Sequence, residues 1–379
     1  MTEKLYYKDA YIKEFDARVI SATPTDGGVE IILDRTAFFP EEGGQSADTG
    51  YISDARVITS YERDGAVVHL ADKAPTADLV HCTLDFADRY EKMQCHTVEH
   101  ILCGIIHRLF GLENVGFHLG ADVVTFDISA PLTRADLDRV EELANEAVFE
   151  NHEITTLFPT PDELSGMQYR SKLDLTENVR IVNIGDVDSC ACCAPHVART
   201  GEIGLIKILD FMKHRGGLRI WMVAGRRALA DYRKKYENLS RISAMLSSPC
   251  HDTADTLEKY MSDTEELKYE LRMAGKRLSD AYAEATPEIC GNLVKLIPGV
   301  GIDELRGFIN SVTPRVSGVA VALTGTDGDY KYVIASGSVN LSAAVREYNA
   351  ALGGRGGGKP NMVQGSFSTT LAEITDYFK

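Results

Sequence analysis

Apolar and polar residues alternate in short segments over residues 1–86, with turn residues between the segments. A period of two is typical of half-buried strands, and several such segments in succession favour a small antiparallel barrel or meander. Residues 11–21 and 28–39 are expected to form a hairpin around the sequence Thr-Pro-Thr-Asp-Gly-Gly at residues 23–28, where proline and glycine supply the turn. We therefore expect a first, barrel-like domain over residues 1–86.

The apolar spacing then becomes helical as far as about Phe110, with Gly111 as its C-cap. Residues 133–151 predict a second helix with Thr133 at its start. Helices and strands that alternate in this way indicate an α+β domain over residues 87–225. Its strands are expected at residues 120–129, 178–184 and 200–211.

Between residues 226 and 290 apolar residues recur at intervals of three and four, and Pro249 should end the first of two helices. The simplest structure is an antiparallel helical hairpin, and a dimeric coiled coil is the alternative. Charged residues fill the rest of the surface, so we interpret this segment as an arm or spacer. A homodimer through this arm or through the C-terminal domain is the corresponding expectation.

Residues 291–379 predict strand, helix, strand, strand and helix in succession, which favours a small α/β domain. A glycine-rich stretch follows at residues 353–366 and carries Arg355 and Lys359. We expect a loop whose backbone and two cations wrap a phosphate, and a flexible linker is the alternative. The fold class is thus α+β, with a barrel, an α+β core, a helical arm and a C-terminal α/β domain.

Composition narrows the class of protein. Of 379 residues, 44% are hydrophobic and 25% charged, which are ordinary globular values, and the length predicts more than one domain. No apolar run approaches the roughly 18 residues of a membrane span, and the N-terminus lacks the apolar core of a signal peptide. We therefore expect a soluble, cytoplasmic protein without a membrane partner. Eight cysteines in such a chain indicate thiols and metal ligands rather than disulfides.

A net charge of −16 would ordinarily argue against a nucleic-acid partner, because lysine and arginine bind the phosphate backbone. A local basic patch can nevertheless bind nucleic acid, and positively charged residues are concentrated just after residue 206. A solvated helix face is the alternative reading of this basic stretch. Its members are Lys207, Lys213, His214, Arg215, Arg219, Arg226, Arg227, Arg233, Lys234 and Lys235.

Two short motifs predict a metal site. His96 and His100 stand four residues apart in a helical pattern, so both imidazoles project from one face. Cys192 and His196 repeat the interval in a segment that Pro195 marks as a loop or helix start. Three nitrogens and one thiolate suit tetrahedral Zn²⁺, and we predict one zinc per chain. Taken singly, the first motif could be two partly buried histidines and the second a redox pair or small buried residues.

The residues that carry these motifs resemble a known family. His-Thr-Val-Glu-His at 96–100 and Cys-Cys-Ala-Pro-His at 192–196, followed by Val-Ala-Arg-Thr-Gly-Glu-Ile-Gly, are similar to the editing domain of alanyl-tRNA synthetases and to the free-standing AlaX trans-editing proteins. The family's commonest second motif is Cys-Gly-Gly-Thr-His, so this chain departs from it at residues 193–195. The ligand positions are kept, and the resemblance implies that they bind zinc.

Residues 36–50 resemble the glycine-rich signature of the barrel that precedes this editing core, with Phe39 in place of tyrosine and Glu42 in place of the first glycine. Two adjacent glycines, Gly43 and Gly44, let the backbone approach a ligand closely. The resemblance implies that Thr36 and Gln45 reach toward the metal site. It also implies that Thr36 recognises a substrate hydroxyl.

Residues 353–364 resemble the glycine-rich signature of the DHH-associated domain that ends alanyl-tRNA synthetases, so the resemblance covers nearly the whole chain. No ATP-binding domain precedes the barrel, and we expect a stand-alone protein. The family implies ATP-independent hydrolysis of tRNA(Ala) mischarged with serine or glycine. Two readings remain open: a non-catalytic, zinc-stabilised RNA-binding module, and another metal-dependent ester hydrolase. The sequence also leaves open whether zinc activates water or only orients the substrate.

Overall fold

The computed structural model describes residues 2–120, 122–171 and 179–379. The chain divides into two compact units, Met1–Asn238 and Leu239–Lys379. Both units contain sheets and helices, so the predicted mixed α+β class is confirmed. Among the described residues, no helix has both the length and the hydropathy that a bilayer span requires.

Six strands of the first unit form a closed barrel, because each is hydrogen-bonded to two neighbours and the last returns to the first. Their inward residues, such as Ala17, Ile31 and Val57, are almost fully buried. In order around the barrel the strands are β2 (Glu14–Thr25), β3 (Gly28–Leu33), β7 (Ala66–Ala71), β6 (Ala55–Arg63), β5 (Gly50–Ile52) and β8 (Leu79–Leu84). Two short strands, β1 (Glu3–Lys4) and β4 (Arg35–Thr36), pair in parallel beside it, and a 3₁₀ turn, η1 (Leu5–Tyr7), follows β1.

The first predicted hairpin forms, but its bounds differ from the expectation. The turn is Asp26-Gly27 alone, since Thr25 pairs with Gly28, and Pro24 pairs with Val29 inside the strand. The second strand ends at Leu33 instead of residue 39. The chain turns there because Asp34 accepts the backbone N–H of Arg18 through its side chain, at 2.7 Å.

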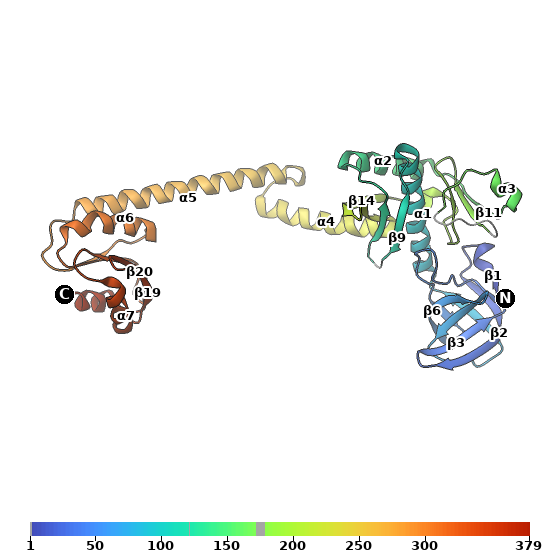
Figure 1. The fold of residues 1–379 in the computed structure, drawn as a ribbon, viewed down its shortest axis with the longest axis horizontal. Helices are drawn as coiled ribbons and strands as arrows, with labels where there is room; N and C mark the ends of the chain where they lie inside the picture. The colour runs from blue at the N-terminus through green and yellow to red at the C-terminus, as the bar shows by residue number, and fades with distance from the viewer. Residues whose placement is uncertain (1, 121, 172–178) are drawn as a thin grey trace. The chain divides into compact units, whose positions relative to one another are not determined.

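Helix α1 (Phe86–Phe110) is the central element of the first unit. It leaves the barrel directly after β8 and runs between a four-stranded and a three-stranded sheet (Figure 1). Gly111 ends it in the left-handed region, with φ of 66°, so the predicted C-cap is confirmed. The four-stranded sheet has the order β14 (Ile206–His214), β15 (Gly217–Ala224), β10 (Val124–Ile128) and β9 (Asn114–Leu119), and the three-stranded sheet the order β11 (Ile154–Leu157), β12 (Ile181–Ile184) and β13 (Asp188–Ala191).

The second predicted helix is α2 (Arg134–Glu150), and Thr133 and Asp136 form a capping box at its start. A short helix, α3 (Pro161–Ser165), has a similar capping box. The expected strands at 120–129 and 178–184 appear as β10 and β12, although residues 121 and 178 lie outside the described part of the chain.

The strand expected from residue 200 is wrong over its first residues, since Thr200–Ile203 form a 3₁₀ turn, η2. Gly204 follows with φ of 83°, a conformation that interrupts an extended strand. The Thr200 hydroxyl donates to the Ala147 carbonyl at 2.6 Å and ties this turn to α2. The strand β14 therefore begins only at Ile206.

A buried ion pair joins the barrel to α1. Arg89 of α1 and Asp48, which precedes β5, are each 1% exposed. The guanidinium Nε donates to both carboxylate oxygens of Asp48, at 2.9 and 2.8 Å, and Nη2 also donates to Asp48. The remaining N–H groups donate to the carbonyls of Ala10 and Ala37. This network fixes the segment before Asp48 against the helix that carries His96.

Two helices follow the first unit's sheets, α4 (Gly225–Leu246) and α5 (Thr253–Glu284), with Pro249 and the 3₁₀ turn η3 (Cys250–Asp252) between them. Two helices with a break at Pro249 were predicted, and this is confirmed. The apolar positions of both helices are largely exposed, so the hairpin and the coiled coil both stay predictions. The exposed positions include Leu229, Tyr232, Tyr236, Leu257, Tyr260, Leu267 and Leu271.

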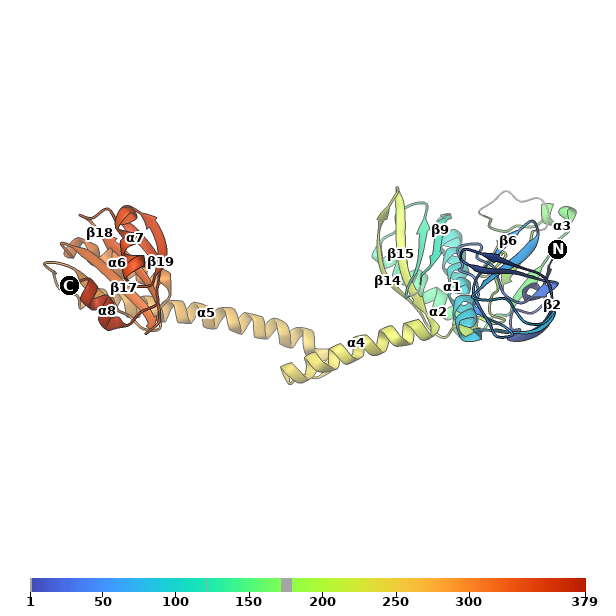
Figure 2. The ribbon, with the colours of Figure 1, turned by 90° about the horizontal axis from the view of Figure 1, so that it is seen from below.

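The second unit contains a five-stranded sheet covered by helices on both faces (Figure 2). Helix α6 packs over Ala320, Ala322 and Val333, whereas α7 and α8 pack over residues such as Val321 and Tyr332 on the opposite face. In sheet order the strands are β16 (Leu293–Leu296), β17 (Val319–Thr326), β18 (Asp329–Ser336), β20 (Met362–Phe367) and β19 (Arg355–Lys359). The helices are α6 (Ile302–Val312), α7 (Leu341–Ala351) and α8 (Leu371–Tyr377), with a 3₁₀ turn, η4 (Thr313–Arg315), after α6.

The glycine-rich stretch is not the predicted loop, because most of it forms the edge hairpin β19–β20. Two of its glycines, Gly356 and Gly365, are needed for close packing of the two strands at Tyr332. A Cβ at Gly356 would lie 2.4 Å from the Tyr332 hydroxyl, and one at Gly365 would lie 2.2 Å from the Arg355 carbonyl. Arg355 and Lys359 are exposed at the two ends of the edge strand.

Candidate metal centre

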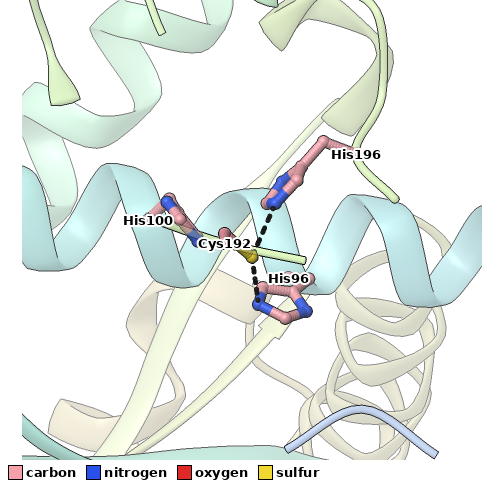
Figure 3. A group of neighbouring side chains, drawn as sticks. All are labelled: His96, His100, Cys192 and His196. Carbon is pink, nitrogen blue, oxygen red and sulfur yellow. Dashed lines mark hydrogen bonds between the residues drawn. The ribbon is translucent and has the colours of Figure 1, made fainter. Parts of the chain in front are cut away.

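The structure brings the four predicted ligand residues together in the first unit. His96 and His100 project from one face of α1, and the segment that follows β13 brings Cys192 and His196 to them (Figure 3). One ligand atom from each residue lies within 4.8 Å of all the others. Cys192 Sγ is 3.6 Å from His96 Nε2 and 3.4 Å from His196 Nε2. The three histidines are buried and Cys192 is partly exposed.

Hydrogen bonds hold two of the imidazoles from behind. His96 Nδ1 donates to the amide oxygen of Gln45 at 3.0 Å, and His100 Nδ1 donates to Asp188 Oδ2 at 3.2 Å. Arg170 donates to the same carboxylate through Nε and Nη2, at 2.7 and 2.8 Å. An acceptor at Nδ1 fixes the tautomer and leaves Nε2 as a lone-pair donor toward the cluster.

The third imidazole is held in the same way. The hydroxyl of Thr97 donates to the Met93 carbonyl at 2.7 Å, so its oxygen accepts from His196 Nδ1, at 3.0 Å. All three histidines therefore face the centre with Nε2. Thr97 lies between the two histidines of α1 and supports a ligand that is distant in sequence.

The geometry of the donors fits zinc. Bonds of about 2.0–2.1 Å to nitrogen and 2.3 Å to sulfur, in a tetrahedral arrangement, place neighbouring donors about 3.3–3.6 Å apart. The Cys192–His96 and Cys192–His196 separations of 3.6 and 3.4 Å lie in this range. One thiolate and three imidazoles are also a donor set that zinc prefers. His96, His100, Cys192 and His196 would hold the ion.

The electrostatics of the cluster favour metal binding. Burial raises the pKa of the Cys192 thiol, but His96 and His100 outweigh burial and hold that pKa well below its usual value. Burial lowers the pKa of His196 to about 3, so its imidazole is neutral. Burial also acts to lower the pKa of His100, yet Cys190, Cys192 and Asp188 raise it well above its usual value. A cation at the centre would take the place of that proton.

A cavity of about 510 Å³ opens onto the cluster. Among its lining residues are the ligands His96, His100 and Cys192. Arg180 also lines it, is 7% exposed, and donates through Nη1 to the carbonyls of Cys192 and Ala194, at 2.8 and 2.9 Å. The arginine thus fixes the segment that carries Cys192. The cavity is of a size that takes a small organic group, such as an aminoacyl ester end.

The glycines Gly43 and Gly44 have different surroundings. Gly43 lines the cavity with φ of 62°, and a Cβ there would lie 3.3 Å from the Cys193 sulfur. Gly44 packs on β9 instead, where a Cβ would meet the ring of Phe117 at 2.7 Å. Of these two glycines, only Gly43 lines the cavity, and substrate binding by either stays a prediction.

Thr36 and Gln45 were expected to reach toward the metal, and the structure brings only Gln45 to the cluster. Thr36 is fully buried in the barrel and is absent from the cavity lining. His69 Nδ1 donates to the Ile31 carbonyl, so the Thr36 hydroxyl donates to His69 Nε2, at 2.8 Å, and accepts from Phe38 N–H. Burial lowers the pKa of His69 to about 4, which keeps it neutral for this role. In this position the Thr36 hydroxyl makes its hydrogen bonds within the barrel and does not face the metal centre.

The two exposed cations proposed for substrate binding, Arg355 and Lys359, lie in the other unit. Sequence reasoning missed Asp188, Arg170, Thr97 and Arg180. The position of Thr97 between His96 and His100 could have indicated a support for the site. The other three depend on long-range pairing that no local spacing reveals: Asp188 lies on β13, Arg170 bridges to Cys190, and Arg180 reaches the carbonyls after β13. His100, Asp188 and Cys190 also form a second group that could hold a metal ion.

Asp188→Asn should weaken zinc binding about 10- to 100-fold, because the carboxylate that orients His100 and accepts its Nδ1 proton is lost. Competition with a chromophoric chelator measures this affinity. Asp127→Asn is the matched control, since Asp127 accepts from Arg219 Nε and Nη2 at 2.8 Å each but lies on β10. Equal zinc affinities of the two variants would contradict the role assigned to Asp188.

Two segments of the chain match known domain families. Residues 179–243, which include Cys192 and His196, match the "Threonyl and Alanyl tRNA synthetase second additional domain". Residues 293–379 match the DHHA1 domain. These segments lie where the metal-binding and C-terminal motifs were found in the sequence.

Full-length relatives extend the match over the whole chain. The alanyl-tRNA editing protein AlaX-L of Pyrococcus horikoshii is 27% identical over 99% of this chain and 97% of its own length. The alanine–tRNA ligase of Ignicoccus hospitalis is 30% identical over 95% of this chain, which spans only 40% of the ligase. The C-Ala domain structure from Aquifex aeolicus alanyl-tRNA synthetase covers 23% of this chain at 21% identity, and its TM-score of 0.21 is too low to establish a common fold. The resemblance predicted from the motifs is confirmed.

Proposed function

We propose that this chain, which resembles alanyl-tRNA editing proteins from end to end, is a zinc-dependent deacylase of tRNA(Ala) mischarged with serine or glycine. The observation that carries the proposal is the cluster of His96, His100, Cys192 and His196, whose donors converge beside a cavity of about 510 Å³. The names of the relatives support tRNA(Ala) as the partner. The match over 97% of the length of the AlaX-L editing protein supports editing in trans.

Hydrolysis of the ester between an amino acid and tRNA requires a water nucleophile and stabilisation of the developing oxyanion. Bound zinc would supply both effects, by lowering the pKa of water and by polarising a carbonyl. The residues of the chain fix the geometry. Gln45, Asp188 and Thr97 hold the three imidazoles, and Arg180 holds the backbone beside Cys192.

Specificity explains the need for a second site. A pocket built for alanine cannot strongly reject glycine, or serine with one added hydroxyl, so errors must be removed elsewhere.

Single-turnover deacylation of Ser-, Gly- and Ala-tRNA(Ala) tests the proposal. We expect hydrolysis of the first or second and sparing of the third, and hydrolysis of none would refute it. An undiminished preference in Thr36→Val would show that Thr36 does not discriminate, as its burial in the barrel favours.

Arg355 and Lys359 are proposed to contact tRNA phosphates from the exposed edge strand β19. Alternate residues share one face of a strand, so the two side chains, four residues apart, point the same way. Replacing both by alanine should weaken tRNA binding and reduce the slope of log K against log salt by roughly 0.7 to 0.9 per lost phosphate contact. Single-turnover rates at saturating enzyme should change little, because uniform binding affects KM more than kcat. An unchanged salt slope would exclude these contacts.

A structural zinc site in a non-catalytic RNA-binding module is the second candidate, because four protein ligands are typical of structural sites. Chelation distinguishes the two. A structural site should unfold when zinc is removed, whereas a catalytic one should lose activity before circular dichroism changes. The cavity beside the ligands favours the catalytic role.

A further inference from the structure

Helix α4 carries an exposed face on which aromatic and cationic residues are interleaved. At 100° per residue, Arg226, Leu229, Tyr232, Arg233 and Tyr236 fall within one third of the helix circumference. All five are exposed, with Tyr232 at 60% and Tyr236 at 54%. The two tyrosine rings are nearly parallel, at 17°, with centroids 6.1 Å apart. We call these five residues the α4 face.

Two cations of the basic stretch that make no ion pair among the described residues, Arg226 and Arg233, lie on this face, and Lys213, Arg215 and Lys234 are further unpaired cations outside it. Within the described residues, neither Arg226 nor Arg233 has an acidic partner within 4 Å, although Glu237 is exposed at the far end of the face. Four other cations of the stretch form ion pairs with acidic residues of the same chain. These ion pairs are Lys207–Glu141, Arg219–Asp127, Arg227–Glu91 and Lys235–Asp231.

A groove lies at the start of the face. It has a volume of about 540 Å³, and its lining residues are Gln94, Glu202, Ile203, Gly204, Leu205, Gly225, Arg226, Leu229 and Tyr232. The Glu202 carboxylate in this lining accepts from the hydroxyls of Tyr11 and Tyr90. The apolar side chains and the Arg226 guanidinium suit a nucleotide, whose base is apolar on its faces and whose phosphate is anionic. The groove lies wholly within the first unit, as does the metal centre.

We propose that the α4 face binds an unpaired stretch of RNA, with bases stacked on Tyr232 and Tyr236 and phosphates on Arg226 and Arg233. The proposal rests on the proposed function in so far as this RNA is the tRNA substrate. In a chain of net charge −16, cations beside stacking rings are complementary to single-stranded RNA. A second copy of the same face fits less well, because it would bring like charges together.

Equilibrium binding of a fluorescently labelled, uncharged tRNA(Ala) transcript to the full chain tests the proposal. Tyr232→Ala/Tyr236→Ala should weaken binding roughly tenfold or more through lost stacking, and Tyr232→Phe/Tyr236→Phe should retain it. Alanine keeps the helix intact. Arg226→Ala/Arg233→Ala should instead lower the salt slope by roughly 0.7 for each phosphate released.

Controls lie on other surfaces. Tyr51→Ala removes a tyrosine that is 44% exposed on the barrel, and Lys235→Ala removes a cation paired with Asp231. Both should bind tRNA like wild type. Wild-type affinity and salt slope in the α4-face variants would overturn the proposal. If light scattering showed a lower mass for the α4-face variants than for wild type while their tRNA affinity was unchanged, the proposal would also be overturned. The face would then be an interface between copies of the chain.

Failure of this proposal and failure of the proposed function give different results. Wild-type protein that binds tRNA through the α4 face but deacylates none of the mischarged tRNAs refutes the proposed function alone. Protein that deacylates Ser-tRNA(Ala) while its α4-face variants bind tRNA normally refutes the α4-face proposal alone.

Discussion

Replacing Cys192 by alanine is expected to empty the metal centre, so that the purified variant retains less than roughly a tenth of the zinc of wild type, which should hold about one ion per chain. The thiolate is the only sulfur donor of the cluster, and its pKa is held low by His96 and His100. Deacylation should be lost with the metal. Elemental analysis of freshly purified protein gives the metal content, and circular dichroism reports whether the chain is folded.

Cys193→Ala is the matched control, because it removes the neighbouring thiol, which lies outside the ligand group. Burial raises the pKa of the Cys193 thiol, so it is a poor thiolate donor. The Cys193→Ala variant should therefore keep its zinc. Full zinc content in Cys192→Ala, or loss of zinc only in Cys193→Ala, would show that the ligands are misassigned.

Arg89→Met should destabilise the protein by about 3–5 kcal/mol, because it leaves the Asp48 carboxylate buried and unpaired. Both residues are 1% exposed, so water cannot compensate for the lost partner. The barrel should also loosen from α1, and with it the segment that places Gln45 behind His96. Urea unfolding gives the free energy of unfolding for the variant and for wild type.

The control is Arg134→Met, which breaks the Arg134–Asp138 pair on α2, where the two side chains are 49% and 55% exposed. Exposed pairs contribute little, so its effect should stay within about 0.5 kcal/mol. Equal losses in the two variants would contradict the central role given to the Arg89–Asp48 pair.

The sequence predicts features that depend on local spacing. Helix α1 and its Gly111 cap follow from apolar periodicity and from the conformational freedom of glycine, and the four ligand residues follow from two intervals of four. The supports of the site depend on long-range pairing. Asp188 reaches His100 only because β13 packs on α1, where Gly104 allows close approach: a Cβ there would lie 2.7 Å from Asp188 Cβ.

The glycine-rich stretch shows why composition can mislead. Glycine permits both a loop and a tightly packed strand, and the choice depends on what lies beneath it. Here Tyr332 of β18 and Phe367 at the end of β20 stack with ring centroids 4.2 Å apart, and a Cβ at Gly356 or at Gly365 would collide with Tyr332, so these two positions require glycine. For Thr36, His69 is the deciding residue, since it lies on β7 and is 33 positions away in sequence.

The most direct test of the central claim is the single-turnover deacylation of Ser-tRNA(Ala) by zinc-loaded wild type, by the same protein after chelation, and by chelated protein given zinc again. We predict that zinc-loaded protein reacts fast and that chelated protein reacts at a rate near that of the uncatalysed ester, with its circular dichroism unchanged. Readdition of zinc should restore the fast rate. A folded, zinc-free protein that deacylates Ser-tRNA(Ala) at the full rate would contradict the central claim.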